Sequence, residues 1–131
     1  FCKSQWKTYK VTAIAPNAFK NCRKLKQATI SKNVSSIGSG AFQGCSSLRT
    51  LKIGSKVSSI GAKAFYDCKA LTSVTIQSKK LTSGSVGKSA FAKAGRNNYK
   101  KLMVKVPKSR LSAYKKLLKA KGLSSKTKVT K

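Results

Sequence analysis

Apolar residues recur along this chain with a period of 23 residues. The unit reads Val-x-x-Ile-Gly-x-x-Ala-Phe-x-x-Cys-x-x-Leu-x-x-Leu-x-Ile, and its most regular copy runs from Val34 to Ile53. Its phenylalanine slot is filled by Phe19, Phe42 and Phe65. A fixed period of this length is typical of a solenoid, in which each unit buries its apolar face only against its neighbours. The pattern therefore predicts stacked coils that share one continuous core.

Each unit predicts one short strand, because its Leu-x-x-Leu-x-Ile segment is rich in branched apolar residues and ends at a polar break. The predicted strands are Leu25–Ile30, Leu48–Ile53, Leu71–Ile76 and Leu102–Val106. The Ala-Phe-x-x-Cys stretch predicts a tight helical turn that carries the chain across the convex side. The last unit is irregular, with three residues inserted around Leu81–Val86 and four within Gly95–Lys101. Terminal repeats commonly deviate in this way.

The segments that flank the repeats indicate how the solenoid begins and ends. We expect a single domain over 1–131, divided into an N-terminal segment at 1–17, repeats at 18–106, a capping helix at 107–123 and a basic tail at 124–131. The N-terminal segment is enriched in strand-forming side chains, namely Trp6, Tyr9, Val11 and Ile14. The tail is expected to fray, as chain ends commonly do.

A helix is predicted over 109–121, with Ser109 as its N-cap and Gly122 directly after its end. Its apolar side chains share one face, and they are Leu111, Tyr114, Leu117 and Leu118. This face would cover the open end of the solenoid core. The alternative is a basic amphipathic helix that binds membrane surfaces, because the helix also carries many Lys and Arg residues.

The charge balance of the chain is extreme. It has 30 Lys and Arg residues, one acid (Asp67) and no His, for a formal net charge of +29. Such an excess bears on partners and solubility rather than on fold. It favours attraction to polyanions such as wall polymers, acidic glycans, anionic membranes or nucleic acid, and it is equally consistent with a coat of lysines that keeps the protein soluble. No recognition helix, zinc finger or RNA-stacking signature predicts specific nucleic-acid binding.

Four cysteines suggest disulfides or a zinc site, but their spacing argues against both. Cys22, Cys45 and Cys68 hold one slot in successive repeats, so we expect them to stack as a ladder of buried free thiols. No pair of cysteines has the short spacing that zinc sites use, so no metal is expected. Cys2 stands outside the repeat register, and both pairing and exposure stay open for it.

Catalytic chemistry has few residues available. Without His and with one Asp, the chain has no paired carboxylates, no Ser-His-Asp triad and no Cys-His pair. The segment 84–89 resembles the end of a phosphate-binding P-loop, but Thr82 stands where that motif needs its first Gly. We therefore expect a protein that is not an enzyme and that holds no cofactor.

The repeats resemble the BspA-type bacterial leucine-rich repeat over residues 11–106, as in Leu48-x-x-Leu51-x-Ile53 followed by Val57-x-x-Ile60-Gly61-x-x-Ala64-Phe65-x-x-Cys68. The resemblance implies an α/β right-handed leucine-rich-repeat solenoid of short parallel strands with helical turns. It also implies an extracellular or cell-surface location in bacteria and a role in adhesion or in binding host or matrix proteins. The family supplies no catalytic residues. One departure is the family's Pro after the strand, which is replaced by Ser31, Gly54 and Gln77.

The repeat pattern indicates which side chains are free to bind a ligand. In Leu-x-x-Leu-x-Ile the apolar residues point inward, so the two intervening positions face outward. The predicted ligand-binding strand face consists of Gln27, Thr29, Thr50, Lys52, Ser73, Thr75, Met103 and Lys105. Most of these side chains are small, and the face lacks the aromatic and Arg anchors of strong protein hot spots. An unoccupied, solvated sheet is the alternative.

A second candidate surface is a polyanion ridge at the turns that follow the strands, formed by Lys32, Lys56, Lys79 and Lys80. No apolar run reaches the roughly 18–20 residues that span a bilayer, so we expect a soluble, monomeric domain, with any targeting segment upstream of Phe1. The sequence thus predicts a non-catalytic extracellular binding or adhesion module. The alternative is charge-driven anchoring to anionic polymers, in which the ridge holds a larger protein on acidic wall polymers or glycans.

Overall fold

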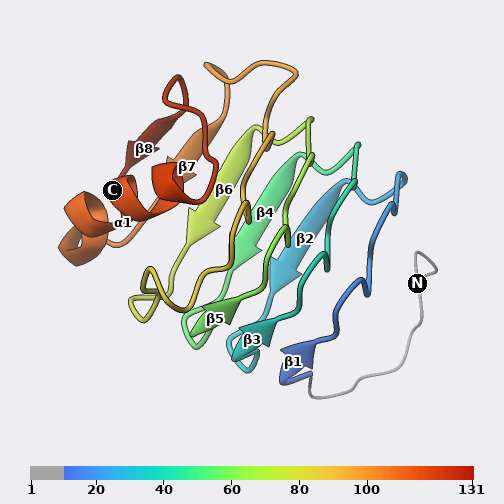
Figure 1. The fold of residues 1–131 in the computed structure, drawn as a ribbon, viewed down its shortest axis with the longest axis horizontal. Helices are drawn as coiled ribbons and strands as arrows, with labels where there is room; N and C mark the ends of the chain where they lie inside the picture. The colour runs from blue at the N-terminus through green and yellow to red at the C-terminus, as the bar shows by residue number, and fades with distance from the viewer. Residues whose placement is uncertain (1–10) are drawn as a thin grey trace.

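Successive coils of the chain stack side by side along one axis, each adding a strand to the same face (Figure 1). A computed structural model describes residues 11–131. Its larger sheet is parallel, with the order β2-β4-β6-β7-β8. The five strands are β2 (Gln27–Ile30), β4 (Thr50–Ile53), β6 (Ser73–Ile76), β7 (Met103–Lys105) and β8 (Lys128–Thr130). The four strands predicted from the repeats are thus present, each shorter than predicted.

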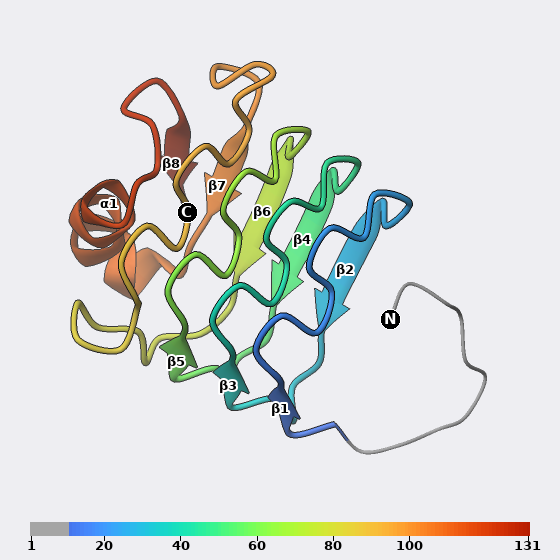
Figure 2. The ribbon, with the colours of Figure 1, turned by 45° about the vertical axis from the view of Figure 1, so that its right-hand side comes forward.

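A second row of very short strands runs along the edge of the coils where the larger strands end (Figure 2). These are β1 (Ala13–Ile14), β3 (Ser36–Ile37) and β5 (Ser59–Ile60), which pair in parallel. Ile37 pairs with Ile60, and Ile60 in turn forms an isolated bridge to Val86. The distance along the chain from Ile60 to Val86 is three residues longer than that from Ile37 to Ile60, which confirms the first predicted insertion. Gly87 therefore continues the Ile-Gly slot of the repeat.

The convex side of each coil is built from consecutive tight turns, and the predicted helical turns are wrong. Two positions in every coil adopt a positive φ: the first is held by Asn17, Gly40, Lys63 and Ser89, the second by Asn21, Gly44, Asp67 and Lys93. A helix requires negative φ throughout, so these residues interrupt it. Between them, alternate backbone N–H groups donate to the next coil, as from Phe42 to Ala64 O at 2.8 Å. The convex side is therefore hydrogen-bonded from coil to coil.

The core runs the length of the solenoid as columns of equivalent residues. Phe19, Phe42, Phe65 and Phe91 stack with ring centroids 5.2, 5.4 and 5.2 Å apart. Leu48, Leu51 and Ile53 are completely buried under β4. Offset stacking of aromatic rings adds a modest stabilisation beyond burial. Every coil thus presents the same apolar surface to the coil before it.

The cysteine ladder is present, with one correction. Cys45 and Cys68 are buried free thiols, and their S–H groups donate to the backbone oxygens of Phe19 and Phe42 at 3.1 and 3.0 Å. Burial raises the pKa of both thiols above the ordinary value, so they stay protonated. Cys22, however, is disulfide-bonded, so the prediction of a free thiol was wrong there. Cys2, like Trp6 and Tyr9, lies outside the described residues.

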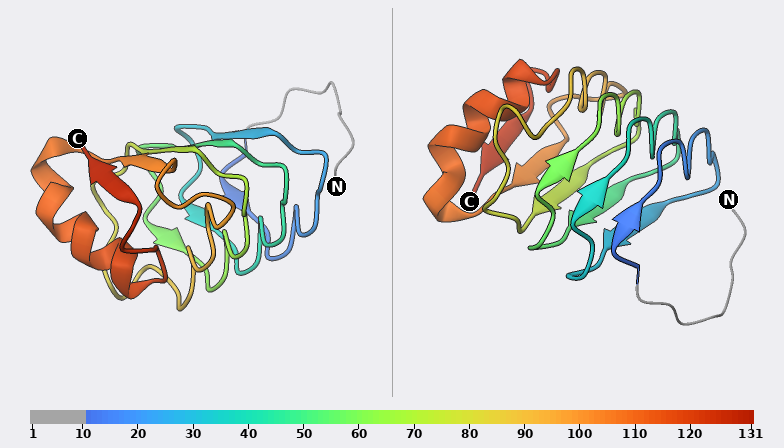
Figure 3. Two further views of the ribbon diagram at one scale, coloured as in Figure 1. Left: turned by 90° about the horizontal axis from the view of Figure 1, so that it is seen from above. Right: turned by 60° about the horizontal axis from the view of Figure 1, so that its bottom comes forward.

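A helix closes the C-terminal end of the solenoid (Figure 3). A short 3-10 turn, η1 (Lys108–Arg110), leads into α1 (Leu111–Ala120). Tyr114, Leu117 and Leu118 are buried, so the apolar face of the helix covers the core as predicted. Ser109 is not the N-cap: Arg110 holds that position, without a side-chain cap bond. Gly122 follows the helix with a φ of +103°, a conformation that suits glycine after a helix C-terminus.

The predicted frayed tail at 124–131 contains a strand instead. β8 pairs with β7 along Met103–Lys128, Val104–Val129 and Lys105–Thr130, and the Val106 N–H donates to Thr130 O at 2.8 Å. Val129 points into the core and is 8% exposed. The Thr127 hydroxyl donates to Tyr99 O at 3.1 Å and fixes the start of the strand. The sheet therefore continues one strand beyond the repeats.

Candidate ligand-binding surfaces

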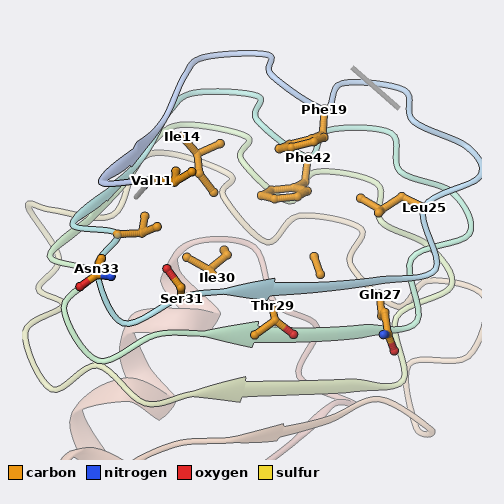
Figure 4. Close-up of a pocket in the computed structure, with 12 residues that line it drawn as sticks. Val11, Ile14, Phe19, Leu25, Gln27, Thr29, Ile30, Ser31, Asn33 and Phe42 are labelled. Carbon is orange, nitrogen blue, oxygen red and sulfur yellow. The ribbon is translucent and has the colours of Figure 1, made fainter. Parts of the chain in front are cut away.

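The predicted strand face lies on the outer side of the five-stranded sheet. Alternation along each strand places its side chains in turn outside and inside, with the burial pattern exposed-buried-exposed-buried in β4. Figure 4 shows this for β2, where Gln27 and Thr29 point away from the side on which Phe19, Phe42 and Ile30 lie. The eight predicted residues are exposed except for Ser73 and Thr75, which are half-buried.

Parallel pairing brings these side chains into two straight columns. One column runs Gln27, Thr50, Ser73, Met103 and Lys128, and the other runs Thr29, Lys52, Thr75, Lys105 and Thr130. Neighbouring strands are about 4.8 Å apart, so the columns present a regularly spaced array of hydroxyl and ammonium groups. Met103 is the one large apolar side chain among them, at 40% exposed.

Sequence reasoning missed the last member of each column, Lys128 and Thr130. Only Val129 within 128–130 carries the apolar signal of a strand, and the segment sits in a run of basic and hydroxylated residues. Its strand conformation comes from pairing with β7, a tertiary effect that local propensity does not report. The alternation Thr127, Lys128, Val129 was the available signal.

The predicted polyanion ridge lies along the turns that follow β2, β4 and β6, which run side by side at one edge of the molecule (Figure 2). Lys32, Lys56, Lys79 and Lys80 are all exposed there. The four lysines do not occupy one equivalent position in the coils. Ile30, Ile53 and Ile76 are paired, and the lysines follow them at different distances along the chain. Lys56 and Lys79 are therefore equivalent, whereas Lys32 is equivalent to Ser55. The ridge is a loose row of cations rather than one column.

The only acidic side chain of the chain is engaged on the convex side. Arg96 Nε donates to Asp67 Oδ1 at 2.6 Å. This hydrogen bond, followed by the charge of Asp67, raises the pKa of Arg96 above its ordinary value. Beside it, the ammonium groups of Lys63 and Lys93 lie 5.4 and 5.5 Å from the ring centre of Tyr66. The remaining cations therefore have no other acidic side chain to pair with.

An apolar hollow of about 440 Å³ lies at the first coil (Figure 4). Val11, Ile14, Phe19, Leu25 and Ile30 line it. The same slots in the following coil hold Val34, Ile37, Phe42, Leu48 and Ile53, all buried in the core. The hollow is therefore the core face of the first coil, equivalent to the face that each later coil presents to its neighbour.

Within residues 11–131, no cluster of three or more His, Cys, Asp or Glu side chains could hold a metal ion. In the same part of the chain, no helix has the length and apolar character required to cross a bilayer.

The fold and the repeating core define the class of protein. Stacked coils that each add a short strand to one parallel sheet, with a repeated spacing of Leu, Ile and Phe slots, form a leucine-rich-repeat solenoid. The sequence model of the BspA type Leucine rich repeat region matches residues 8–127 in six copies. The chain therefore belongs to the BspA-type leucine-rich-repeat family, and such repeats indicate a protein-interaction module.

A solved structure supports the same fold. A leucine-rich repeat protein from Bacteroides ovatus ATCC 8483 superposes with a TM-score of 0.68 over 90% of this chain, at 24% sequence identity. The match covers 27% of that protein, so the chain spans about a quarter of the length of its structural relative. No curated protein matches the chain.

Proposed function

We propose that this chain is a non-catalytic binding module of a bacterial cell-surface or secreted protein, and that it adheres to a host or matrix protein. The family supports a protein-interaction role. The observation that carries the proposal is the outer strand face, where ten side chains stand in two columns on a five-stranded parallel sheet. Solenoids commonly bind through such an extended face.

The test is binding of the wild type and of single variants to immobilised extracellular-matrix proteins. Thr75 lies at the centre of its column, between Lys52 and Lys105. Thr75→Arg places a bulky cation there and should abolish binding, while Ser55→Arg, at an exposed turn, adds the same charge and should leave binding intact. Binding should persist in about 500 mM salt, where the screening length falls to roughly 4 Å. Equal effects of the two variants would contradict a shaped site on the strand face.

A second candidate function is charge-driven anchoring to an anionic polymer. It is supported by 30 basic residues against one acid, and by the pairing of that acid with Arg96. In this case neutralising lysines anywhere on the surface should weaken binding nearly additively, and salt should remove it. Titrating binding of an anionic polymer from about 50 to 500 mM salt separates the two functions, because the screening length falls about threefold over this range.

A further inference from the structure

The loops that precede the strands lie at the edge of the sheet opposite the ridge (Figure 1), and several of their residues are basic. Three of these loops, before β4, β6 and β7, enclose a basin of about 410 Å³. We name it the cationic basin, and its polar lining consists of Arg49, Lys69, Thr72, Asn97, Asn98 and Lys101. Arg49, Asn97, Asn98 and Lys101 are exposed, and Lys69 and Thr72 are half-buried.

Backbone hydrogen bonds hold the three loops of the basin together. Arg49 O accepts from the Thr72 N–H at 2.9 Å and from the Thr72 hydroxyl at 3.3 Å. Lys69 O accepts from the Asn97 N–H at 3.0 Å, and Thr72 O accepts from the Met103 N–H at 3.1 Å. The backbone from which the side chains of the basin project is thus preorganised.

The basin exists because the last repeat is longer than the others. β6 pairs with β7 through Ser73 and Met103, whereas β4 pairs with β6 through Thr50 and Ser73. The step to β7 is seven residues longer, and four of these fall within the inserted segment 95–101 predicted from the sequence. This segment places Asn97, Asn98 and Lys101 beside Lys69, where the regular repeats have only a short loop.

Three cations and two side-chain amides line the basin, and no acidic residue is among its lining residues. Asp67, the one acid of the chain, is bound to Arg96, whose side chain does not line the basin. An oxyanion in the basin would relieve the repulsion among Arg49, Lys69 and Lys101. An Arg guanidinium can hold a carboxylate or sulfate through two parallel hydrogen bonds.

We propose that the cationic basin binds an acidic polysaccharide, with anionic groups on its cations and sugar hydroxyls on the Asn amides. Asn side chains both donate and accept hydrogen bonds, as recognition of hydroxyl groups requires. No aromatic ring lines the basin, so it lacks the aromatic platforms on which single-stranded nucleic-acid bases stack. The inference rests on the charge-anchoring function and gives that function a defined site and ligand class.

Lys26 extends this surface along the sheet edge. It is exposed in the loop before β2, and its backbone oxygen accepts from the Arg49 N–H at 2.8 Å. Adjacent strands are about 4.8 Å apart, so Lys26, Arg49 and the basin follow one another across the starts of the strands. A linear polymer therefore lies across the coils, perpendicular to the strands.

The test compares two variants that lose the same charge. The basin variant carries Arg49→Gln, Lys69→Gln and Lys101→Gln, and the ridge variant carries Lys32→Gln, Lys56→Gln and Lys79→Gln. Calorimetry at about 150 mM salt measures their binding to heparin, to polygalacturonate and to duplex DNA of mixed sequence. The basin variant should bind one of the polysaccharides at least about tenfold more weakly than the wild type, since it lacks the charged donors of the hydrogen bonds to the anionic groups. The ridge variant should lose less than about threefold, as expected of distant, screened charges.

The remaining outcomes separate the inference from the function on which it rests. Equal losses in the two variants overturn the basin and leave distributed charge anchoring intact. No binding of either polysaccharide by the wild type overturns both. Tighter binding of duplex DNA, lost in the basin variant, overturns the ligand class. Side-chain amide shifts of Asn97 and Asn98 on adding oligogalacturonate provide a reading on the unmodified protein, and their absence on saturation with oligomer also counts against the basin.

Discussion

Gly61 lies where two neighbouring coils approach through their backbones. A Cβ atom at this position would lie 2.3 Å from Ser39 N and 2.6 Å from Ser39 Cα. Gly38 and Gly87 occupy the same slot in neighbouring coils and would clash in the same way with Pro16 N and Ala62 N, at 2.4 and 2.3 Å. The glycine after each Ile or Val therefore sets the distance between coils.

We predict that Gly61→Ala destabilises the protein by at least about 1–3 kcal/mol, because neither backbone can move without displacing the stacked coils. Gly84→Ala is the matched control, since no atom lies within 4 Å of its Cβ position. That variant should be neutral or up to about 1 kcal/mol more stable, through the reduced freedom of the unfolded chain. Urea-induced unfolding measures both, and equal midpoints for the two variants would refute the argument.

At the residue scale, the sequence predicts which side chains face the core and which face outward, because the repeat spacing and the period of a strand together determine it. Leu51 and Ile53 are buried and Lys52 is exposed, as predicted. The backbone of the convex turns could not be predicted as well. Gly40 and Gly44 suggest positive φ, but Lys63 and Asp67 fill the same slots in the next coil, held there by coil-to-coil hydrogen bonds.

Among the elements, α1 makes side-chain hydrogen bonds to the repeats through one buried tyrosine. The Tyr114 hydroxyl donates to Ser78 O at 2.7 Å and accepts from the Leu81 N–H at 3.1 Å. It thereby satisfies the backbone of the inserted loop between β6 and the last coil. Burial raises the pKa of this hydroxyl above its ordinary value of 10.0, so it stays neutral and able to donate at neutral pH.

Tyr114→Phe should cost about 1–3 kcal/mol at neutral pH, because it leaves two buried backbone groups without a partner. The difference in the free energy of unfolding between this variant and the wild type should become smaller as the pH rises. Since the folded pKa is raised, the folded state holds the proton more tightly than the unfolded chain above pH 10, and the wild type loses this stability as pH passes the folded pKa.

Free energies of unfolding in urea, measured at neutral and alkaline pH, test this prediction. Tyr66→Phe is the control: Tyr66 is half-buried on the convex surface, and its ring contacts Lys63 and Lys93. Removing the hydroxyl of Tyr66 should lower the free energy of unfolding much less than removing that of Tyr114. A gap between the Tyr114 variant and the wild type that stays constant with pH would show that the hydroxyl proton is not coupled to folding.

The elements at the C-terminal end also show where sequence prediction stops. The apolar face of α1 could be predicted from the sequence because Leu111, Tyr114 and Leu118 repeat with helical spacing. Strand β8 could not be predicted, because the single buried side chain of Val129 gives no periodic pattern. The cationic basin could not be predicted from the sequence either. Arg49, Lys69 and Lys101 come from three different coils, and only the strand register brings their loops together.

At the scale of the whole molecule, the dominant physical feature is one sign of charge on an elongated surface. The formal net charge is +29, and within residues 11–131 the one ion pair between side chains is that of Asp67 with Arg96. Repulsion among like charges opposes the compact state more than the expanded unfolded chain, in which the charges lie further apart. The hydrophobic columns and coil-to-coil hydrogen bonds therefore hold the solenoid together against its own charge.

Added salt should consequently raise the thermal unfolding midpoint of the wild type. Between about 50 and 500 mM sodium chloride, the screening length falls from roughly 14 to 4 Å, and most of the repulsion between separate coils is removed. The ridge variant, with three fewer charges, should start from a higher midpoint at low salt and gain less from the same addition. The three substituted lysines are exposed, so a difference between the two proteins reports charge rather than core packing. Thermal unfolding followed by circular dichroism measures how the midpoint of each protein changes with salt concentration. A midpoint that falls with salt, or identical slopes for the two proteins, would show that paired or bound ions already neutralise the surface.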